Sequence, residues 1–357
     1  MPRLLFILHG MGVHDANWAE PTVRHIARIP EEYGYSFFEQ SGPLETHVTL
    51  APISYDVAFT DLLTQWAESA DELEAFADTH GADIGRCLSF LRNASPTENR
   101  FFWTSVVDVL MYRFFSIVSA RVKLIVREEI VRRFNQEAAA GAIVDVSVLA
   151  HSLGTAVAHD SLSVLATQPI MTPAGPNRAF MTGNFQFKRL FQVANVSRVL
   201  QTDPAVLASP IHPFTFEPST SYTRGYLNFR HRFDVFPAVQ PFTPHADWKA
   251  GYVEPGGVRR ILGFNVHDLD LYLDDPRVHI PLLRQLIGPE VVSPDEEVAA
   301  LAQYDAKPEP QCIAELEAFK DRVDSLIHEC TSGDLEDLVI GVTRALASAK
   351  EAKDACV

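Results

Sequence analysis

The chain has few of the features that mark secreted or membrane-spanning proteins. It has four cysteines, which show neither the CxxC spacing of a zinc or redox site nor the density of a disulfide scaffold. We therefore expect reduced thiols at Cys87, Cys312, Cys330 and Cys356. The sequence also lacks any run of about 18 uncharged apolar residues, so no membrane-spanning helix is predicted.

Positive charge is scarce as well. The chain carries 30 basic and 46 acidic side chains, a formal net charge of −16, and such a surface repels phosphate backbones. A DNA or RNA partner is therefore not expected. The apolar run Leu4–Leu8 ends at His9-Gly10, which makes it shorter than the roughly 7–15 apolar residues of a signal peptide. The resulting expectation is a soluble, cytoplasmic protein.

The pattern of apolar segments predicts an α/β fold with a mainly parallel central sheet flanked by helices. Short apolar runs alternate with helical patterns over residues 1–288, as is typical of a sheet that is covered on both faces. We expect helices at 21–29 and 155–167. Strands are expected at 3–8, 47–53, 143–149, 189–196, 225–233 and 258–264.

Two regions differ from this pattern. Residues 56–140 form a mainly helical insertion with six aromatic side chains between residues 101 and 115; it is either helix core or a lid or cap over a site. Residues 289–357 hold 16 of the acidic side chains and only 6 of the basic ones. Apolar residues three or four apart predict two helices there, around 313–330 and 335–346. This C-terminal helical hairpin either packs on the body or joins identical subunits.

A serine between small residues lies where the third predicted strand passes into a helix, in Ala150-His151-Ser152-Leu153-Gly154. Small neighbours permit a sharp, strained turn that exposes the serine hydroxyl. The N-terminus of the following helix favours the negative charge that develops during acyl transfer. The motif predicts that Ser152 is a nucleophile. The alternative is that Ser152 only caps the helix.

A second motif, His9-Gly10-Met11-Gly12, follows the first predicted strand. Acyl transfer needs two N–H donors that converge on the oxyanion, and the loss of one costs roughly 10²–10³ in rate. The backbone N–H groups of Met11 and Leu153 are the candidates. The alternative is a glycine turn that serves only its own loop.

Together the two motifs resemble those of the lipase and esterase branch of the α/β-hydrolase superfamily, over residues 1–288. The resemblance implies that Met11 and Leu153 form the oxyanion hole and that the catalytic residues follow in the order serine, acid, histidine. One departure is Ala150, where the family pattern usually has glycine. Alanine is also small, so the turn is still expected.

The acid and the histidine are chosen by this order. Asp234 ends the fifth predicted strand, and Asp203 is the reserve candidate. His267 follows the last predicted strand and begins a segment that resembles the terminal histidine loop and helix of lipase-like hydrolases, where Asp268 is expected to cap the helix. The rival histidines are His231, His245 and His279.

These residues predict a serine hydrolase that cleaves carboxylic esters through an acyl-enzyme on Ser152. His267 would act as the base and Asp234 would orient it, without a cofactor or metal. A small-molecule or lipid-like ester is the expected substrate, since the loops are rich in aromatic residues and proline. Thioesters and amides are alternatives at the same site. A different class of function is a catalytically silent hydrolase fold that binds partners.

Overall fold

The computed structural model describes the chain in segments between residues 3 and 321. The described residues are 3–10, 17–61, 112–113, 116–139, 145–172, 175–200, 211, 213, 221–244, 248, 251–262, 266–309, 317–318 and 321.

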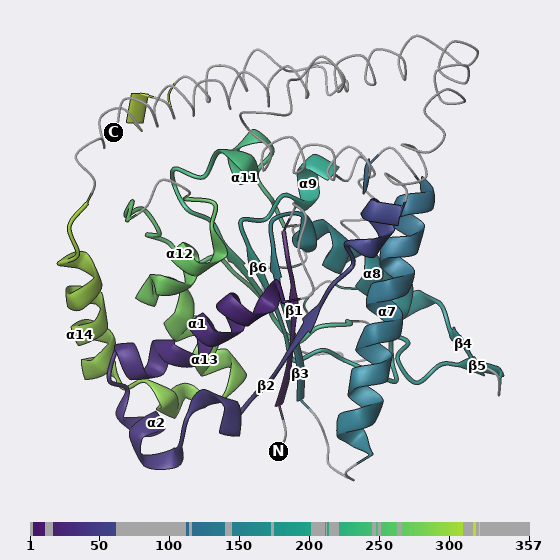
Figure 1. The fold of residues 1–357 in the computed structure, drawn as a ribbon, viewed down its shortest axis with the longest axis horizontal. Helices are drawn as coiled ribbons and strands as arrows, with labels where there is room; N and C mark the ends of the chain where they lie inside the picture. Colours follow the sequence, from purple (N-terminus) through teal and green to yellow (C-terminus); the bar gives the residue numbers. More distant parts are fainter. Residues whose placement is uncertain are drawn as a thin grey trace.

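Six parallel strands form the central sheet, in the spatial order β2-β1-β3-β6-β7-β8. Their carboxyl ends meet at one edge, at the top of Figure 1, which is where open α/β sheets bind ligands. The predicted α/β architecture with a mainly parallel sheet is confirmed. The strands are β1 (Arg3–Leu8), β2 (Thr49–Ile53), β3 (Asp145–His151), β6 (Arg189–Val193), β7 (Tyr226–Phe229) and β8 (Tyr252–Val253).

Helices cover both faces of the sheet (Figure 1). α7 (Ser116–Ala138) and α8 (Leu153–Thr167) lie on one face, while α1 (Ala19–Glu32), α12 (Leu269–Asp274) and α13 (Pro276–Leu286) lie on the other. Successive strand residues point to opposite faces, so each strand contributes to two hydrophobic cores. In β3, for example, Val148 packs toward α7 and α8, and Leu149 packs toward α13.

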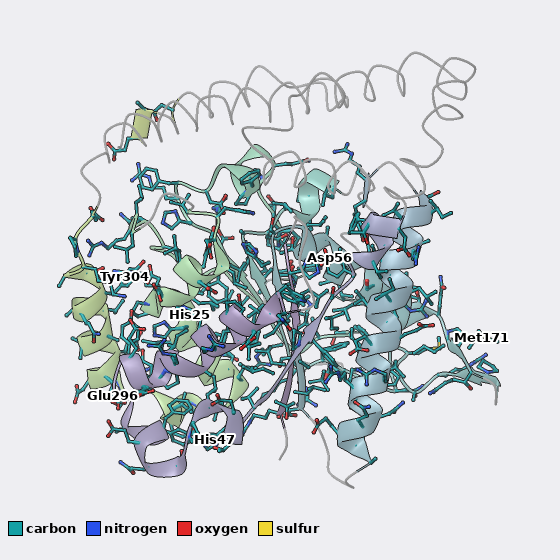
Figure 2. All side chains as sticks on the ribbon, viewed as in Figure 1. His25, His47, Asp56, Met171, Glu296 and Tyr304 are labelled. Atoms are coloured by element: carbon teal, nitrogen blue, oxygen red, sulfur yellow. The ribbon has the colours of Figure 1, made fainter. Side chains whose placement is uncertain are left out.

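Shorter elements surround this framework. A two-stranded hairpin projects beyond α7, and Met171 in its first strand is 74% exposed (Figures 1 and 2). No helix among the described residues is both long and apolar enough to cross a bilayer. The shorter elements are α2 (Ser36–Ser41), η1 (Leu44–Thr46), β4 (Ile170–Thr172), β5 (Gly175–Asn177), α9 (Ser197–Leu200) and α11 (Val235–Val239).

The last strand lies earlier in the chain than predicted. The structure has β8 at Tyr252–Val253 and no strand within the described residues 254–262, so the expectation of a strand at 258–264 is wrong. The intervening Pro255-Gly256-Gly257 explains the difference. Proline has no N–H to donate to a sheet, and Gly257 has a positive φ of 99°, which turns the chain out of the strand direction.

The described end of the insertion at 56–140 belongs to the core. α7 packs on α8 and on the sheet, and four side chains at four-residue spacing are buried: Val118, Val122, Val126 and Ile130. This part is an ordinary covering helix. Residues 62–111 lie outside the described residues, so the lid or cap stays a prediction.

The acidic C-terminal region begins with residues that are part of the core. η3 (Pro289–Val291) and α14 (Pro294–Asp305) pack on the body, and Val291 and Val292 are fully buried. A capping box between Ser293 and Glu296 begins α14. The helices predicted around 313–330 and 335–346 lie outside the described residues, apart from helical residues at 317, 318 and 321.

Candidate active site

The serine motif forms a strained turn at the carboxyl edge of the sheet. β3 ends at His151, α8 begins at Leu153, and Ser152 between them has φ 53° and ψ −124°. A positive φ is uncommon in a residue with a side chain and costs on the order of 1–3 kcal/mol. Hydrogen bonds to the backbone of Ser152 hold the turn, since its N–H donates to the carbonyl of Val193 at 3.0 Å and its carbonyl accepts from the Thr155 hydroxyl at 2.6 Å.

Two glycines allow the end of β1 to lie directly against this turn. A Cβ atom at Gly154 would be 2.4 Å from the carbonyl oxygen of His9, which is well inside van der Waals contact. A Cβ atom at Gly10 would be 3.0 Å from both Ser152 Cβ and His151 Nδ1. The two sequence motifs are therefore in contact in the folded chain, and backbone packing fixes their relative position.

Three of the predicted residues come together in one hydrogen-bonded chain. The distance from His267 Nε2 to Ser152 Oγ is 2.7 Å, and that from His267 Nδ1 to Asp234 Oδ2 is 2.8 Å. An ionised carboxylate can only accept, so Nδ1 carries the proton and donates to Asp234. His267 Nε2 is then the acceptor for the Ser152 hydroxyl.

The Asp234 carboxylate is buried, with three donors around it. Asp234 follows β7, caps α11 and is 1% exposed. Its Oδ1 accepts from the backbone N–H of Phe236 at 3.1 Å, and its Oδ2 accepts from the Tyr272 hydroxyl at 2.8 Å as well as from His267. These donors offset the cost of burying a negative charge.

The His267 loop is held on both sides. The His267 backbone carbonyl accepts from His151 Nε2 at 2.7 Å. The centroid of the His267 ring lies 4.5 Å from that of the Phe236 ring. Asp268 caps α12 by accepting from the backbone N–H of Asp270, as predicted. The loop thus connects the serine turn to the helix that carries Tyr272.

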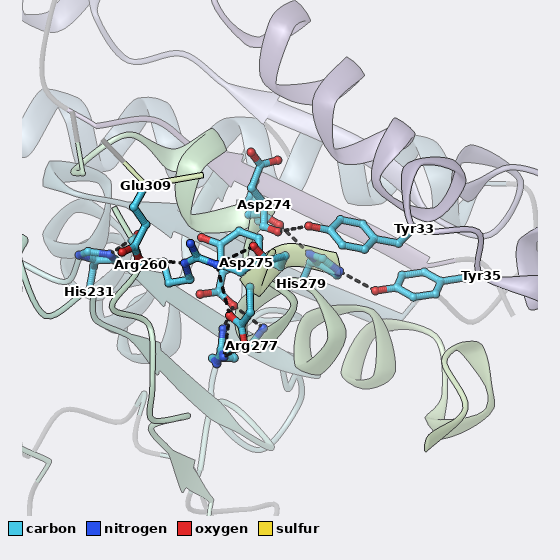
Figure 3. A network of polar contacts seen from close by, with 12 residues as sticks. Tyr33, Tyr35, His231, Arg260, Asp274, Asp275, Arg277, His279 and Glu309 are labelled. Atoms are coloured by element: carbon cyan, nitrogen blue, oxygen red, sulfur yellow. Dashed lines mark hydrogen bonds and ion pairs between the residues drawn. The ribbon is translucent and has the colours of Figure 1, made fainter. Parts of the chain in front are cut away.

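Two rival histidines have structural contacts instead (Figure 3). His231 Nε2 donates to the carbonyl of Arg260 at 3.0 Å. His279 lies between the Tyr35 hydroxyl at 2.6 Å and the carbonyl of Leu273 at 2.7 Å, and burial lowers its pKa to about 3. Neither ring contacts Ser152 by a hydrogen bond found in the structure.

One of the two predicted oxyanion-hole donors, Leu153, lies among the described residues. Leu153 is the first residue of α8, where helix geometry leaves backbone N–H groups without partners inside the helix. Its N–H therefore lies beside Ser152 at the positive end of the helix dipole. Met11 lies outside the described residues, as do the reserve acid Asp203 and the third rival, His245.

The serine hydroxyl is not exposed, which corrects one expectation. The sharp turn was expected to present Oγ to solvent, but Ser152 is 0% exposed. Gly10 lies next to its Cβ, and His267 Nε2 is 2.7 Å from its Oγ. The His267 side chain is 12% exposed, so the imidazole is the most accessible of the three catalytic candidates.

Metal ligands do not gather in the described part of the chain. No group of three or more His, Cys, Asp or Glu side chains there has the arrangement of a metal site. The acid–base chemistry available to the site is that of a hydroxyl, an imidazole and a buried carboxylate. Such a chain can withdraw a proton from the serine and stabilise the resulting imidazolium.

Sequence reasoning gave no role to Tyr272 or to the side chain of His151. Both lie inside segments that the motifs define, but their contacts join residues far apart in the chain. The one signal in the sequence for such a role is that Tyr272, an aromatic residue with a hydroxyl, lies on the helix that follows His267.

Comparison with protein-family models found no match, and comparisons with curated proteins and with solved structures found none either.

Proposed function

We propose that this protein is a serine hydrolase of the α/β-hydrolase type that cleaves carboxylic esters. The observation that supports the proposal is the hydrogen-bonded chain from Ser152 through His267 to Asp234, with the serine on a strained strand-to-helix turn. The order serine, acid, histidine along the chain is the order that this class uses.

The proposed reaction is a two-step acyl transfer. His267 Nε2 takes the proton of the Ser152 hydroxyl while Oγ attacks the ester carbonyl carbon, and Asp234 stabilises the imidazolium. The Leu153 N–H, with that of Met11 as second donor, binds the oxyanion. The C–O bond to the alcohol breaks, and the imidazolium returns its proton to the leaving oxygen. Water then hydrolyses the acyl-enzyme by the same steps.

The surroundings of the site favour an apolar acyl or aryl group. The Phe236 ring lies against His267, so an apolar wall borders the reacting atoms. Because Ser152 is 0% exposed, a substrate carbonyl reaches Oγ only when neighbouring atoms move aside. Lipid-like and aromatic esters fit this environment, and thioesters and amides are alternative substrates for the same chemistry.

The test is a chain-length series of p-nitrophenyl esters with the wild type and Ser152→Ala. We expect turnover in the wild type and its loss in the variant. Ser161→Ala is a matched control, since Ser161 is another fully buried serine and lies further along α8. This variant is expected to retain activity. Full turnover by Ser152→Ala would refute the assignment of the nucleophile.

The burial of Ser152 also favours a second candidate, a hydrolase fold without catalysis that binds partners. This candidate predicts that a fluorophosphonate does not label Ser152 and that no ester is turned over. The esterase predicts labelling that Ser152→Ala abolishes. Mass spectrometry of the labelled protein separates the two.

A further inference from the structure

The phenol of Tyr272 contacts the same carboxylate oxygen as the histidine. Tyr272 lies in the middle of α12, five residues after His267, and is 1% exposed. Its hydroxyl is 2.8 Å from Asp234 Oδ2, and His267 Nδ1 is 2.8 Å from that oxygen. The phenol and the imidazole therefore share one acceptor.

The direction of the phenol hydrogen bond is fixed by a second contact. The backbone N–H of His231 donates to the Tyr272 hydroxyl at 2.9 Å, and an N–H group cannot accept. The hydroxyl oxygen is thus the acceptor from His231, and its own proton points to Asp234. Burial, together with the nearby Asp234 charge, raises the pKa of Tyr272 well above its usual value, so the phenol keeps its proton throughout the working pH range.

We propose that Tyr272 is a positioning residue for the hydrolysis proposed above, and that its hydroxyl holds the Asp234 carboxylate in the orientation that aligns His267 with Ser152. This inference rests on the proposed function. Without the phenol, the donors that the described residues give this carboxylate are the N–H of Phe236 on Oδ1 and the His267 imidazole on Oδ2. With two donors in place of three, the orientation of the Asp234 carboxylate would be less tightly held.

The position of α12 also links Asp234 to His267. His267 lies two residues before the start of α12, and Tyr272 lies within it. A movement of α12 therefore moves the imidazole and the donor to its partner together. Since a displacement of about 1 Å can lower the rate of a reaction substantially, this coupling is relevant to kcat.

The test compares Tyr272→Phe with Tyr222→Phe. Tyr222 is a matched control because it is also fully buried and its hydroxyl donates to a backbone carbonyl, that of Phe180, in a different part of the core. For Tyr272→Phe we expect kcat to fall on the order of 10-fold with KM within about twofold, since one hydrogen bond to a charged group is lost. Tyr222→Phe should leave both constants within about twofold.

The pH dependence of kcat/KM distinguishes a positioning role of Tyr272 from a general destabilisation of the core. Tyr272 withdraws negative charge from Oδ2, so its removal lets the carboxylate stabilise the imidazolium form more strongly. The acid limb of the kcat/KM profile should therefore move to higher pH in Tyr272→Phe and stay in place in Tyr222→Phe. An unchanged profile and kcat in Tyr272→Phe, or equal changes in both variants, would overturn the proposal.

A proton NMR measurement tests the geometry without turnover. A proton between imidazole Nδ1 and a buried carboxylate resonates far downfield. We expect Tyr272→Phe to shift this resonance and Tyr222→Phe to leave it in place; no shift would overturn the positioning role. If the wild type shows no turnover that depends on Ser152, the proposed function fails, and this resonance alone decides the role of Tyr272.

Discussion

The serine turn and the segment that carries the acid and histidine are built in different ways. The turn is a strand, one strained residue and a helix, and glycines at 10 and 154 let the backbones touch. Asp234 and His267 lie outside strands and helices, and side-chain hydrogen bonds hold them. Backbone packing thus fixes the proposed nucleophile, and polar contacts hold its proposed partners.

Because of this difference, we expect substitutions in the two regions to have different effects on folding stability and on reaction rate. A change in the serine turn is expected to disturb the sheet core, because β1, β3 and α8 all meet there. A change in the acid–histidine segment is expected to alter the rate more than the folding. The first two predictions below test one region each, the third tests the contact between the two regions, and the fourth concerns a helix outside both.

The largest expected effect is on the rate, from Asp234→Asn. The amide cannot hold His267 in the tautomer with a proton on Nδ1, so kcat should fall on the order of 10⁴-fold. The measurement is steady-state hydrolysis of a p-nitrophenyl ester. Asp268→Asn is the control, because Asp268 is exposed and an asparagine there still caps α12. Equal activity in both variants would contradict the role of Asp234.

The next effect is on stability, from Gly154→Ala. The new methyl group would be 2.4 Å from the carbonyl of His9, so β1 and α8 must separate. We expect a loss of about 3 kcal/mol in the free energy of unfolding, measured by urea denaturation. Gly256→Ala is the control, since nothing lies within 4 Å of its Cβ position. Equal stability of the two variants would show that the close approach is not required.

His151→Ala tests the contact that joins the two regions. It removes the donor to the His267 carbonyl, and we expect kcat to fall on the order of 10-fold because the imidazole loop loses one anchor. His47→Ala is the control, since that side chain contacts Ser41 at the surface. An unchanged kcat with a lower stability would assign His151 to the serine turn alone.

The smallest effect is expected outside both regions, from Glu296→Gln. Desolvation would raise the pKa of Glu296, but hydrogen bonds from Ser293 and Ser36 outweigh it and lower the pKa to about 2. The carboxylate therefore stabilises the fold above pH about 4.5, and this contribution is lost as the pH falls toward 2. Because the group is largely solvated, we expect a loss of about 0.5–1 kcal/mol at pH 7.

Urea denaturation at several pH values checks this prediction. The difference between wild type and Glu296→Gln should shrink below pH about 4.5 and vanish near pH 2, and ester hydrolysis at pH 7 should be unchanged. A difference that stays constant with pH would show that the ionised carboxylate is not the source of the stabilisation.

Regular features were predictable from the sequence, and irregular ones were not. Five of the six expected strands are present, because runs of buried β-branched and aliphatic residues are local signals. The turn at Ser152 follows from its small neighbours. The two-residue β8 is too short to leave a pattern, and α14 was missed although its capping box begins at Ser293.

The candidate site shows the same division. The serine motif selected Ser152, and the chain order that the resemblance implies selected Asp234 and His267. In the structure, His267 lies within hydrogen-bonding distance of both other side chains. The donors that hold them could not be found in this way. Tyr272 and Asp234 are 38 residues apart, and His151 and His267 are 116 apart, so only the folded chain makes them neighbours.

Arg260 contacts both the turn that leads to Asp234 and the segment that follows α14 (Figure 3). Its guanidinium donates to the carbonyls of Tyr304 and Lys307 and to Glu309, while its own carbonyl accepts from His231, three residues before Asp234. A shortened version of the protein that stopped before residue 304 would leave this guanidinium without those acceptors. Any trimming for crystallisation or immobilisation should therefore leave the chain intact through Glu309.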